Sequence, residues 1–496
     1  MPPIDALRER LAELADLSSL GLLAAWDQRA MMPPGGAPAR SHAFATLERL
    51  MHQRATGDEL GAWIAKLEAD GDGLSDLDRD LVRLARRDWD RRRRVPRELA
   101  GQLAQAGAEG QATWQVARAE NDFGAFAPAL RRNVELAREY AACFPDAAGP
   151  YDALLADYDF GLTAARVKTV FDRLAEELPP MVAEAAARPA LPKLHVPVEA
   201  QQAAVRATLA RLGVDAESWR VDTSAHPFSA TISPGDSRMT TRYEDAGIER
   251  VLAAVHEFGH GLYERQIAAR LARTNLGCGT SMSIHESQSK LWENHVGQHP
   301  AFLPSVAAAL TDGGYPVDTE TLLSWCRDLR PSLIRTSADQ LTYPLHIVLR
   351  FGLELELVEG RLDVADVPEA WNEGMRRLLG IDVPDDAHGV LQDVHWAAGS
   401  FGYFPSYALG CLISAQLWET LEADLGPQAE AIARGDFAPI REWLGDRIHQ
   451  HGRRLDTEPL LERATGRGLD AEPFLRHVRM LMDDAQPDSN IAVSRG

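Results

Sequence analysis

Apolar residues recur every three or four positions along most of the chain, and this spacing constrains the fold more than any other feature of the sequence. Alanine, leucine, arginine and glutamate, which favour helices, dominate these stretches. One segment departs from the pattern, because residues 219–243 carry valine, threonine and isoleucine around a Ser-Pro-Gly-Asp turn. We therefore expect a mainly α fold with one small β-sheet. The N-terminal helices are predicted at residues 4–24, 37–70, 75–93, 97–119, 126–143 and 164–187.

Changes in composition divide the chain of 496 residues into three parts. A proline-rich segment over residues 187–197 interrupts the helical pattern and predicts a boundary there. Residues 1–190 would form an N-terminal helical region, and residues 191–482 would form the region that carries most of the motifs described below. The polar, non-periodic residues 483–496 predict a disordered tail.

Charge and hydropathy exclude several classes of partner. The formal net charge of −21 argues against nucleic-acid binding, because phosphate recognition needs a basic face. No window approaches the roughly 18 consecutive apolar residues of a membrane span, and the first residues lack the apolar core of a secretory signal. The four cysteines are scattered and form no C-x-x-C pair, which is typical of a reducing compartment. We expect a cytoplasmic protein without nucleic-acid or membrane partners.

The sequence His256-Glu257-Phe258-Gly259-His260 matches the H-E-x-x-H pattern and lies in a stretch with helical periodicity. Four-residue spacing puts both imidazoles on one helix face, about one turn apart, so both can reach one zinc ion. Glu257 projects close to the histidines but cannot easily bind the same ion. It is therefore free to act as the general base that takes a proton from water.

A catalytic zinc site needs a third protein ligand. Glu264 is eight residues from His256, which is about 12 Å of helix rise and too far to share the ion. A second element must supply the ligand, and Glu286 follows a glycine-rich connection that lets the chain double back. His285 and Glu293 are rivals that spacing alone does not exclude.

Several further motifs follow one another in a fixed order and carry a resemblance to a known family. They are H-P-F at 226–228, D-x-R-x-T at 236–240, H-E-S-Q-S at 285–289, I-R-x-x-A-D at 334–339 and G-x-x-Q-D-x-H-W at 389–396. With the H-E-x-x-H pattern they resemble the carboxypeptidase Taq family of metallocarboxypeptidases. The segments at 26–36 and 399–410 look similar too, so the resemblance extends over nearly the whole chain.

The resemblance implies a metal site formed by His256, His260 and Glu286, with Glu257 as the base. It also implies a zincin-like helical fold with a small sheet beside a deep active-site cleft, N-terminal helices that cover the cleft, and a homodimer. One departure is visible, because the family commonly has arginine where this chain has Lys290. Lysine lacks the planar fork of arginine, so a hydrogen-bond network through this position is in doubt.

A carboxypeptidase must recognise the free C-terminal carboxylate of its peptide substrate, for which arginine is well suited. Arg238 and Arg335 are the candidates, because both lie in matched motifs. Each has a structural alternative, and Arg335 could instead pair with Asp339 four residues later.

Other polar residues in the matched segments are candidates for contact with the reacting groups. His395 could donate a hydrogen bond to the scissile carbonyl, and Tyr407 or Tyr403 could offer a phenol. His226 lies at the edge of the predicted sheet and could contact bound peptide. Asp393 could orient a metal-binding histidine, with Asp236 and Asp339 as rivals for that position.

The predicted function is a zinc-dependent carboxypeptidase of broad specificity that acts on peptides with a free C-terminus. Cobalt or another divalent ion could replace zinc, since nitrogen and oxygen ligands discriminate poorly between such metals. An oligopeptidase that cuts internally has the same chemistry and is the main alternative. A peptide-binding protein without catalysis is a third hypothesis, which the presence of Glu257 and all three proposed ligands disfavours.

Overall fold

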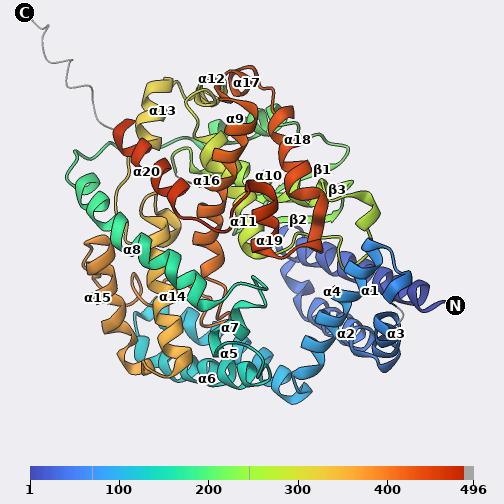
Figure 1. Ribbon diagram of the computed structural model, residues 1–496. Helices are drawn as coiled ribbons and strands as arrows, with labels where there is room; N and C mark the ends of the chain where they lie inside the picture. Colours follow the sequence, from blue (N-terminus) through green and yellow to red (C-terminus); the bar gives the residue numbers. More distant parts are fainter. Residues whose placement is uncertain (70, 245, 485–496) are drawn as a thin grey trace, which may run out of the picture.

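The computed structural model describes residues 1–484 except residues 70 and 245, and it is largely helical (Figure 1). The N-terminal helices lie where they were predicted, with three differences. The first helix continues to Ala30, residues 37–69 form two helices, and the short helix Pro150–Leu155 was not predicted. Gly57 adopts an extended ψ of 144°, which ends the first of the two helices within residues 37–69. The helices of this region are α1 (Pro3–Ala30), α2 (Ala37–Thr56), α3 (Asp58–Ala69), α4 (Asp76–Arg94), α5 (Arg97–Glu120), α6 (Phe123–Ala142), α7 (Pro150–Leu155) and α8 (Ala164–Ala186).

The predicted small sheet is present and is the only one in the part of the chain that the structure describes. It contains β1 (Trp219–Thr223), β2 (Ser229–Ser233) and β3 (Asp236–Thr241). The central strand β3 pairs in parallel with β1 and antiparallel with β2, and the β2 ladder is irregular at Thr231–Ser233. Helix α9 (Val198–Arg211) precedes the sheet, and α10 (Glu249–Arg265) follows it and packs against β2 and β3.

The C-terminal half continues as helices around the sheet and α10. Helix α11 (Met282–Lys290) passes directly into the π-helix η4 (Leu291–Gly297). The remaining α-helices are α12 (Leu303–Asp312), α13 (Thr319–Cys326), α14 (Tyr343–Glu359), α15 (Val367–Leu379), α16 (Pro405–Leu425), α17 (Ala429–Arg434), α18 (Ala438–Arg447), α19 (Thr457–Thr465) and α20 (Glu472–Asp484). The 3₁₀ turns are η1 (Pro34–Gly36), η2 (Gly71–Gly73), η3 (Ala269–Leu271), η5 (Arg335–Ser337), η6 (Val364–Asp366) and η7 (His449–Arg454).

The packing separates α1–α4 from the rest of the molecule. One large hydrophobic core extends through α5–α20, whereas buried residues of α1, α3 and α4 form a smaller core with the segment 267–276. Figure 1 shows these N-terminal helices, in blue, gathered at one flank. Helix α1 packs against β2, so this group lies beside the sheet. The predicted division at residue 190 stays a prediction.

The predicted tail is only partly described. Residues 483 and 484 close α20, and residues 485–496 lie outside the described residues. Among the described helices, none combines the length and apolar character needed to cross a membrane.

Candidate metal centre and active site

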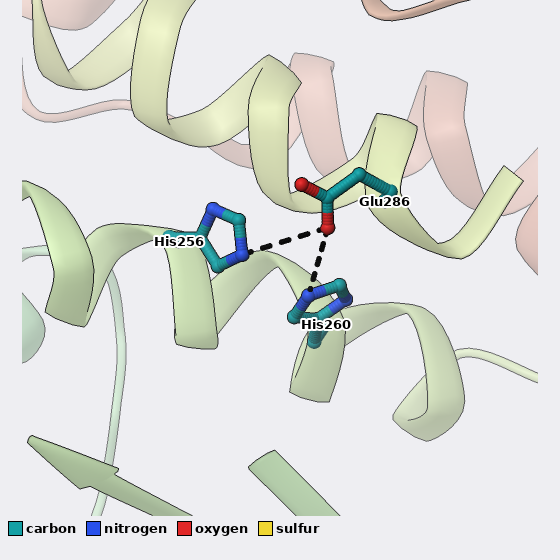
Figure 2. Close-up of side chains that lie close together, drawn as sticks. All are labelled: His256, His260 and Glu286. Atoms are coloured by element: carbon teal, nitrogen blue, oxygen red, sulfur yellow. Dashed lines mark ion pairs between the residues drawn. The ribbon is translucent and has the colours of Figure 1, made fainter. Parts of the chain in front are cut away.

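The structure brings together the two histidines of α10 and one carboxylate of α11. Figure 2 shows the imidazoles of His256 and His260 turned towards the side chain of Glu286. The Oε2 atom of Glu286 is 3.6 Å from Nε2 of His256 and 3.5 Å from Nε2 of His260. One potential ligand atom from each residue lies within 4.8 Å of the others. This spacing suits three side chains that share one ion.

Two glycines allow this approach of the helices. A Cβ atom at Gly259 of α10 would lie 2.6 Å from the carbonyl oxygen of Gln288, and one at Gly410 of α16 would lie 2.4 Å from Cγ of Glu286. Real Cβ atoms do not come this close, so α11 can pack against both neighbours only where they carry glycine. The backbone therefore helps to set the position of Glu286.

The second ring nitrogen of His256 contacts one of the predicted rivals for the third ligand. Nδ1 of His256 is 2.8 Å from Oε2 of Glu293, which also accepts a hydrogen bond from Nζ of Lys290 at 2.8 Å. The Lys290 ammonium lies 5.0 Å from the ring centroid of Tyr343. Lys290 thus maintains a hydrogen bond and an aromatic contact where the family commonly has arginine. Glu293 lies behind the histidine, where it can orient the imidazole.

His260 is supported in a similar way by the other rival. Its Nδ1 atom is 2.7 Å from Nδ1 of His285, whose Nε2 atom is 3.0 Å from Oε1 of Glu264. The backbone N–H of Gly279 donates to the same Glu264 oxygen. Both rivals therefore contact the ring nitrogens of the histidines that face away from Glu286.

Glu257 is buried beside this trio. Its Oε2 atom has no hydrogen-bond partner among the described residues. Burial raises the pKa of Glu257 to about 7, and the negative charges of Glu286 and Glu293 act in the same direction while His256 opposes them. A buried carboxylate with an unused oxygen and a raised pKa can accept and release a proton near neutral pH.

A buried cluster of two arginines and one aspartate lies on η5, on α14 and before α16. Oδ1 of Asp393 accepts hydrogen bonds from Nε and Nη2 of Arg335 at 3.1 and 2.9 Å, and Oδ2 accepts one from Nε of Arg350 at 2.7 Å. The alternative pairing of Arg335 with Asp339 is wrong, because Asp339 instead accepts from Thr342 at the start of α14. Asp393 contacts arginines rather than the two histidines of α10.

His395 and the two tyrosines form an aromatic group next to this cluster. Nε2 of His395 is 3.2 Å from the hydroxyl of Tyr407, and its ring stacks on Tyr403 at 5.6 Å. Burial, together with the charges of Arg335 and Arg350, lowers the pKa of His395 to about 4 although Asp393 opposes the shift. His395 is therefore neutral at physiological pH.

The other two predicted substrate-binding residues belong to the small sheet and to the connection between its first two strands. Arg238 on β3 donates two hydrogen bonds of 2.8 Å to Asp236, and its guanidinium lies 4.3 Å from the ring centroid of Trp26 on α1. His226 is exposed between β1 and β2. Asp236 thus pairs with Arg238, so neither it nor Asp339 contacts the histidines of α10.

Sequence reasoning missed two buried charged residues of α14. Arg350 is fully buried, and Glu354 accepts hydrogen bonds from Tyr151, Trp396 and the backbone N–H of Gly402. The available signal was the presence of only three charged residues, Arg350, Glu354 and Glu356, in the otherwise largely apolar stretch HIVLRFGLELELV, where a surface helix would show a full polar face.

The trio of side chains fits a divalent metal ion. Two imidazole nitrogens and one carboxylate oxygen are the ligand set of catalytic zinc sites, and each histidine already has a partner for its second nitrogen. The neighbouring Glu257 has an oxygen to spare for water. This combination, on a helix beside a small sheet, defines the class of metal-dependent peptidases with an H-E-x-x-H helix.

Comparisons with known proteins agree with this class. The profile of the Carboxypeptidase Taq (M32) metallopeptidases matches residues 6–482. Thermostable carboxypeptidase 1 of Thermus thermophilus is 42% identical over 485 residues, which cover 93% of this chain and 94% of the relative. Carboxypeptidase 1 of Bacillus subtilis is 32% identical over 466 residues, with 92% and 93% covered.

Solved structures give the same result. A Pyrococcus furiosus carboxypeptidase superimposes with a TM-score of 0.93 at 34% identity and covers 97% of this chain and 99% of its own. Trypanosoma cruzi metallocarboxypeptidase 1 gives a TM-score of 0.93 at 32% identity with the same coverage. This chain belongs to the carboxypeptidase Taq (M32) family, which confirms the resemblance that the motifs predicted. It is a metallocarboxypeptidase, and the family implies a divalent metal ion.

Proposed function

We propose that this protein is a zinc-dependent carboxypeptidase of broad specificity, with His256, His260 and Glu286 as metal ligands and Glu257 as general base. The observation that carries the proposal is the convergence of the three potential ligand atoms within 4.8 Å of one another, beside a buried carboxylate with an unpartnered oxygen. Cobalt is an alternative occupant, because this ligand set suits several divalent ions.

Zinc, when bound, supplies Lewis-acid chemistry that acidifies water and polarises the carbonyl of the scissile bond. Glu257 accepts the proton of the attacking water on its free oxygen and delivers it to the departing amine. Its raised pKa of about 7 supports both transfers near neutral pH. Glu293 and His285 hold the imidazoles of His256 and His260 in orientation.

Arg335 is the proposed anchor for the C-terminal carboxylate of the peptide. It shares Asp393 with a second guanidinium, so its charge is incompletely balanced. Arg238 is the weaker candidate, because Asp236 forms its ion pair with this guanidinium and with no second one among the described residues. A bidentate arginine contact is suited to a terminal carboxylate.

His395, Tyr407 and Tyr403 are proposed to donate hydrogen bonds to the scissile carbonyl or to the oxyanion that forms from it. Proximity to the metal centre supports this assignment, because the negative charge of Glu286 contributes, after burial, to raising the pKa of both phenols. His226, exposed before β2, is proposed to contact the peptide further from the reacting bond.

The resemblance to the family also supports a homodimer with a deep cleft under the N-terminal helices, and the scattered cysteines support a reducing, cytoplasmic location. Light scattering coupled to size-exclusion chromatography tests the dimer.

Mass spectrometry of peptide products tests the function. A mixed peptide pool incubated with the zinc-loaded enzyme should yield ladders that shorten from the C-terminus. One peptide with a free C-terminus and its C-terminal amide should differ at least tenfold in turnover, since the amide leaves a buried guanidinium without its partner. Equal removal of the last residue from both peptides would contradict the anchor, and internal cuts would favour the oligopeptidase.

A further inference from the structure

None of the catalytic roles proposed above involves Arg350, although it is one of the largest fully buried side chains among the described residues. Its Nε and Nη2 atoms lie 2.7 and 2.6 Å from Oδ2 of Asp393, and its Nη1 donates to the carbonyl of His346 at 2.7 Å. The guanidinium also lies 4.5 Å from the ring centroid of Trp371. Arg350 is therefore held rigidly on the side of Asp393 that Arg335 does not use.

The charges of this cluster do not balance. Two guanidiniums share the single carboxylate of Asp393, and neither hydrogen-bonds to a second carboxylate among the described residues. His395 lies 3.9 Å from Asp393 and adds no compensating negative charge. Glu354, one helical turn beyond Arg350, accepts hydrogen bonds from Tyr151, Trp396 and Gly402 instead of from either guanidinium. Burial raises the pKa of Glu354 to about 7, although these hydrogen bonds and the charge of Arg350 oppose the shift.

The guanidiniums of Arg335 and Arg350 differ in their exposure and in their surroundings. Arg350 is 0% exposed, whereas Arg335 is 7% exposed and its Nη1 donates to the hydroxyl of Tyr343 at 3.2 Å. The Arg335 guanidinium lies 4.9 Å from the ring centroid of Tyr407, and the hydroxyl of this tyrosine contacts His395. Arg335 therefore lies beside the aromatic group formed by His395 and the tyrosines. The surplus positive charge is thus available to a ligand only through Arg335.

We propose that Arg350 is a positioning residue that keeps the carboxylate site cationic, by competing with Arg335 for the negative charge of Asp393. Without Arg350, Asp393 would neutralise Arg335 and the site would lose its attraction for the terminal carboxylate of a peptide. This inference rests on the proposed role of Arg335 as anchor. Asp393 orients both guanidiniums, but its single negative charge neutralises only one of them.

A charge-compensation series tests the inference. Turnover of one peptide as the free acid and as the amide is measured for the wild type, Arg350→Met, Asp393→Asn and the double variant. Arg350→Met should reduce the preference for the free acid by about tenfold, mainly through KM, because Asp393 then pairs with Arg335 alone. The double variant should recover the preference, because Arg335 is again unpaired.

The single Asp393→Asn variant gives an independent arm if Arg350→Met folds poorly. It should keep or increase the preference for the free acid even if its overall turnover falls. Arg350→Lys, which retains the charge but lacks the planar fork, should keep more of the preference than Arg350→Met. Circular dichroism and metal content establish that each protein is folded and loaded.

The possible results distinguish the role of Arg350 from the role of Arg335 as the carboxylate anchor. A wild-type enzyme without preference for the free acid would contradict the anchor itself. A wild type with the preference, together with an Arg350→Met variant that retains it, would overturn the role of Arg350 alone. A double variant worse than Arg350→Met would also overturn it, because purely structural losses accumulate whereas restored charge recovers function.

Discussion

Each histidine of the metal centre uses one ring nitrogen towards the metal position and the other towards a supporting side chain. His256 turns Nε2 towards Glu286 and Nδ1 towards Glu293, and His260 does the same between Glu286 and His285. A carboxylate or imidazole behind each ring selects the tautomer whose free nitrogen faces the metal position. Each imidazole is therefore oriented by a group behind it, and each residue can be tested by itself.

Glu257→Gln should reduce turnover by about 10²- to 10⁴-fold, because the amide keeps the shape of the side chain but cannot accept the proton. Metal content and thermal unfolding should stay close to wild type, since Glu257 is not among the three converging ligands. Hydrolysis of a free-acid peptide and elemental analysis on the same preparation measure both effects. Near wild-type turnover with full metal content would rule out Glu257 as the base.

Glu286→Ala should lose zinc, because two imidazoles alone make a poor zinc site. Titration with a chromogenic chelator measures the affinity. Glu293→Ala is the matched comparison, and it should weaken zinc binding by about 10- to 100-fold without abolishing it, as expected of a group behind a ligand. If the Glu286 variant retained tight stoichiometric zinc and the Glu293 variant lost it, the ligand role would pass to Glu293.

At the scale of elements, the metal centre depends on how α11 lies between α10 and α16. Gly259 and Gly410 remove the side chains that would otherwise separate these helices. Tyr407 stands one turn before Gly410 on the same helix, so the packing that sets Glu286 also places a phenol nearby. Helix packing thus positions the ligand and the aromatic group together.

Gly410→Ala should destabilise the fold by about 1–3 kcal/mol and weaken zinc binding, because the added methyl group would overlap Glu286. Gly352→Ala on α14 is the control, since a Cβ there meets no other atom within 4 Å. That change should be neutral or stabilising by about 0.5–1 kcal/mol, as alanine favours helices. Equal effects of the two substitutions on zinc affinity would contradict the packing argument.

At the scale of the whole molecule, a buried histidine of η4, His295, packs against a partly buried histidine of α20, His477. The His477 ring lies 4.4 Å from that of His295, which stacks on Trp418 at 5.5 Å. Nε2 of His477 is 2.9 Å from the side-chain oxygen of Gln340. Burial lowers the pKa of His477 to about 3 and that of His295 well below its ordinary value.

These histidines predict that the protein loses stability in mild acid. An unfolded histidine has a pKa of about 6.5, whereas these folded ones have lower values. Between the two pKa values the unfolded chain binds protons that the folded chain does not bind, so the free energy of unfolding falls as pH falls. Each histidine contributes about 1.4 kcal/mol per pH unit in this window. Denaturant unfolding at pH 7 and pH 4.5 measures the change.

His477→Gln should reduce that pH dependence, whatever its effect on stability at pH 7. His42→Gln on the exposed surface of α2 serves as the matched control. If the difference in unfolding free energy between the two pH values were the same in His477→Gln as in the wild type, His477 would not contribute to the acid sensitivity.

The sequence by itself determined the features that depend on residues close together in the chain. Spacing of three and four residues predicted most helices, the β-rich segment 219–243 predicted the sheet, and the four-residue interval between His256 and His260 predicted two imidazoles on one face. The ordered motifs predicted the family. The break between α2 and α3 at Gly57 escaped this reasoning, because helical periodicity continues across it.

Only the tertiary structure decided which distant side chains meet. Spacing favoured Glu286 as the third ligand but did not exclude His285 or Glu293. In the structure, the close packing of α11 on Gly259 and Gly410 turns Glu286 towards both histidines. The sharing of Asp393 by Arg335 and Arg350, more than 40 residues away in the chain, likewise has no local signal. Local periodicity encodes which face of a helix is buried, whereas the partner it is buried against depends on how all the elements pack.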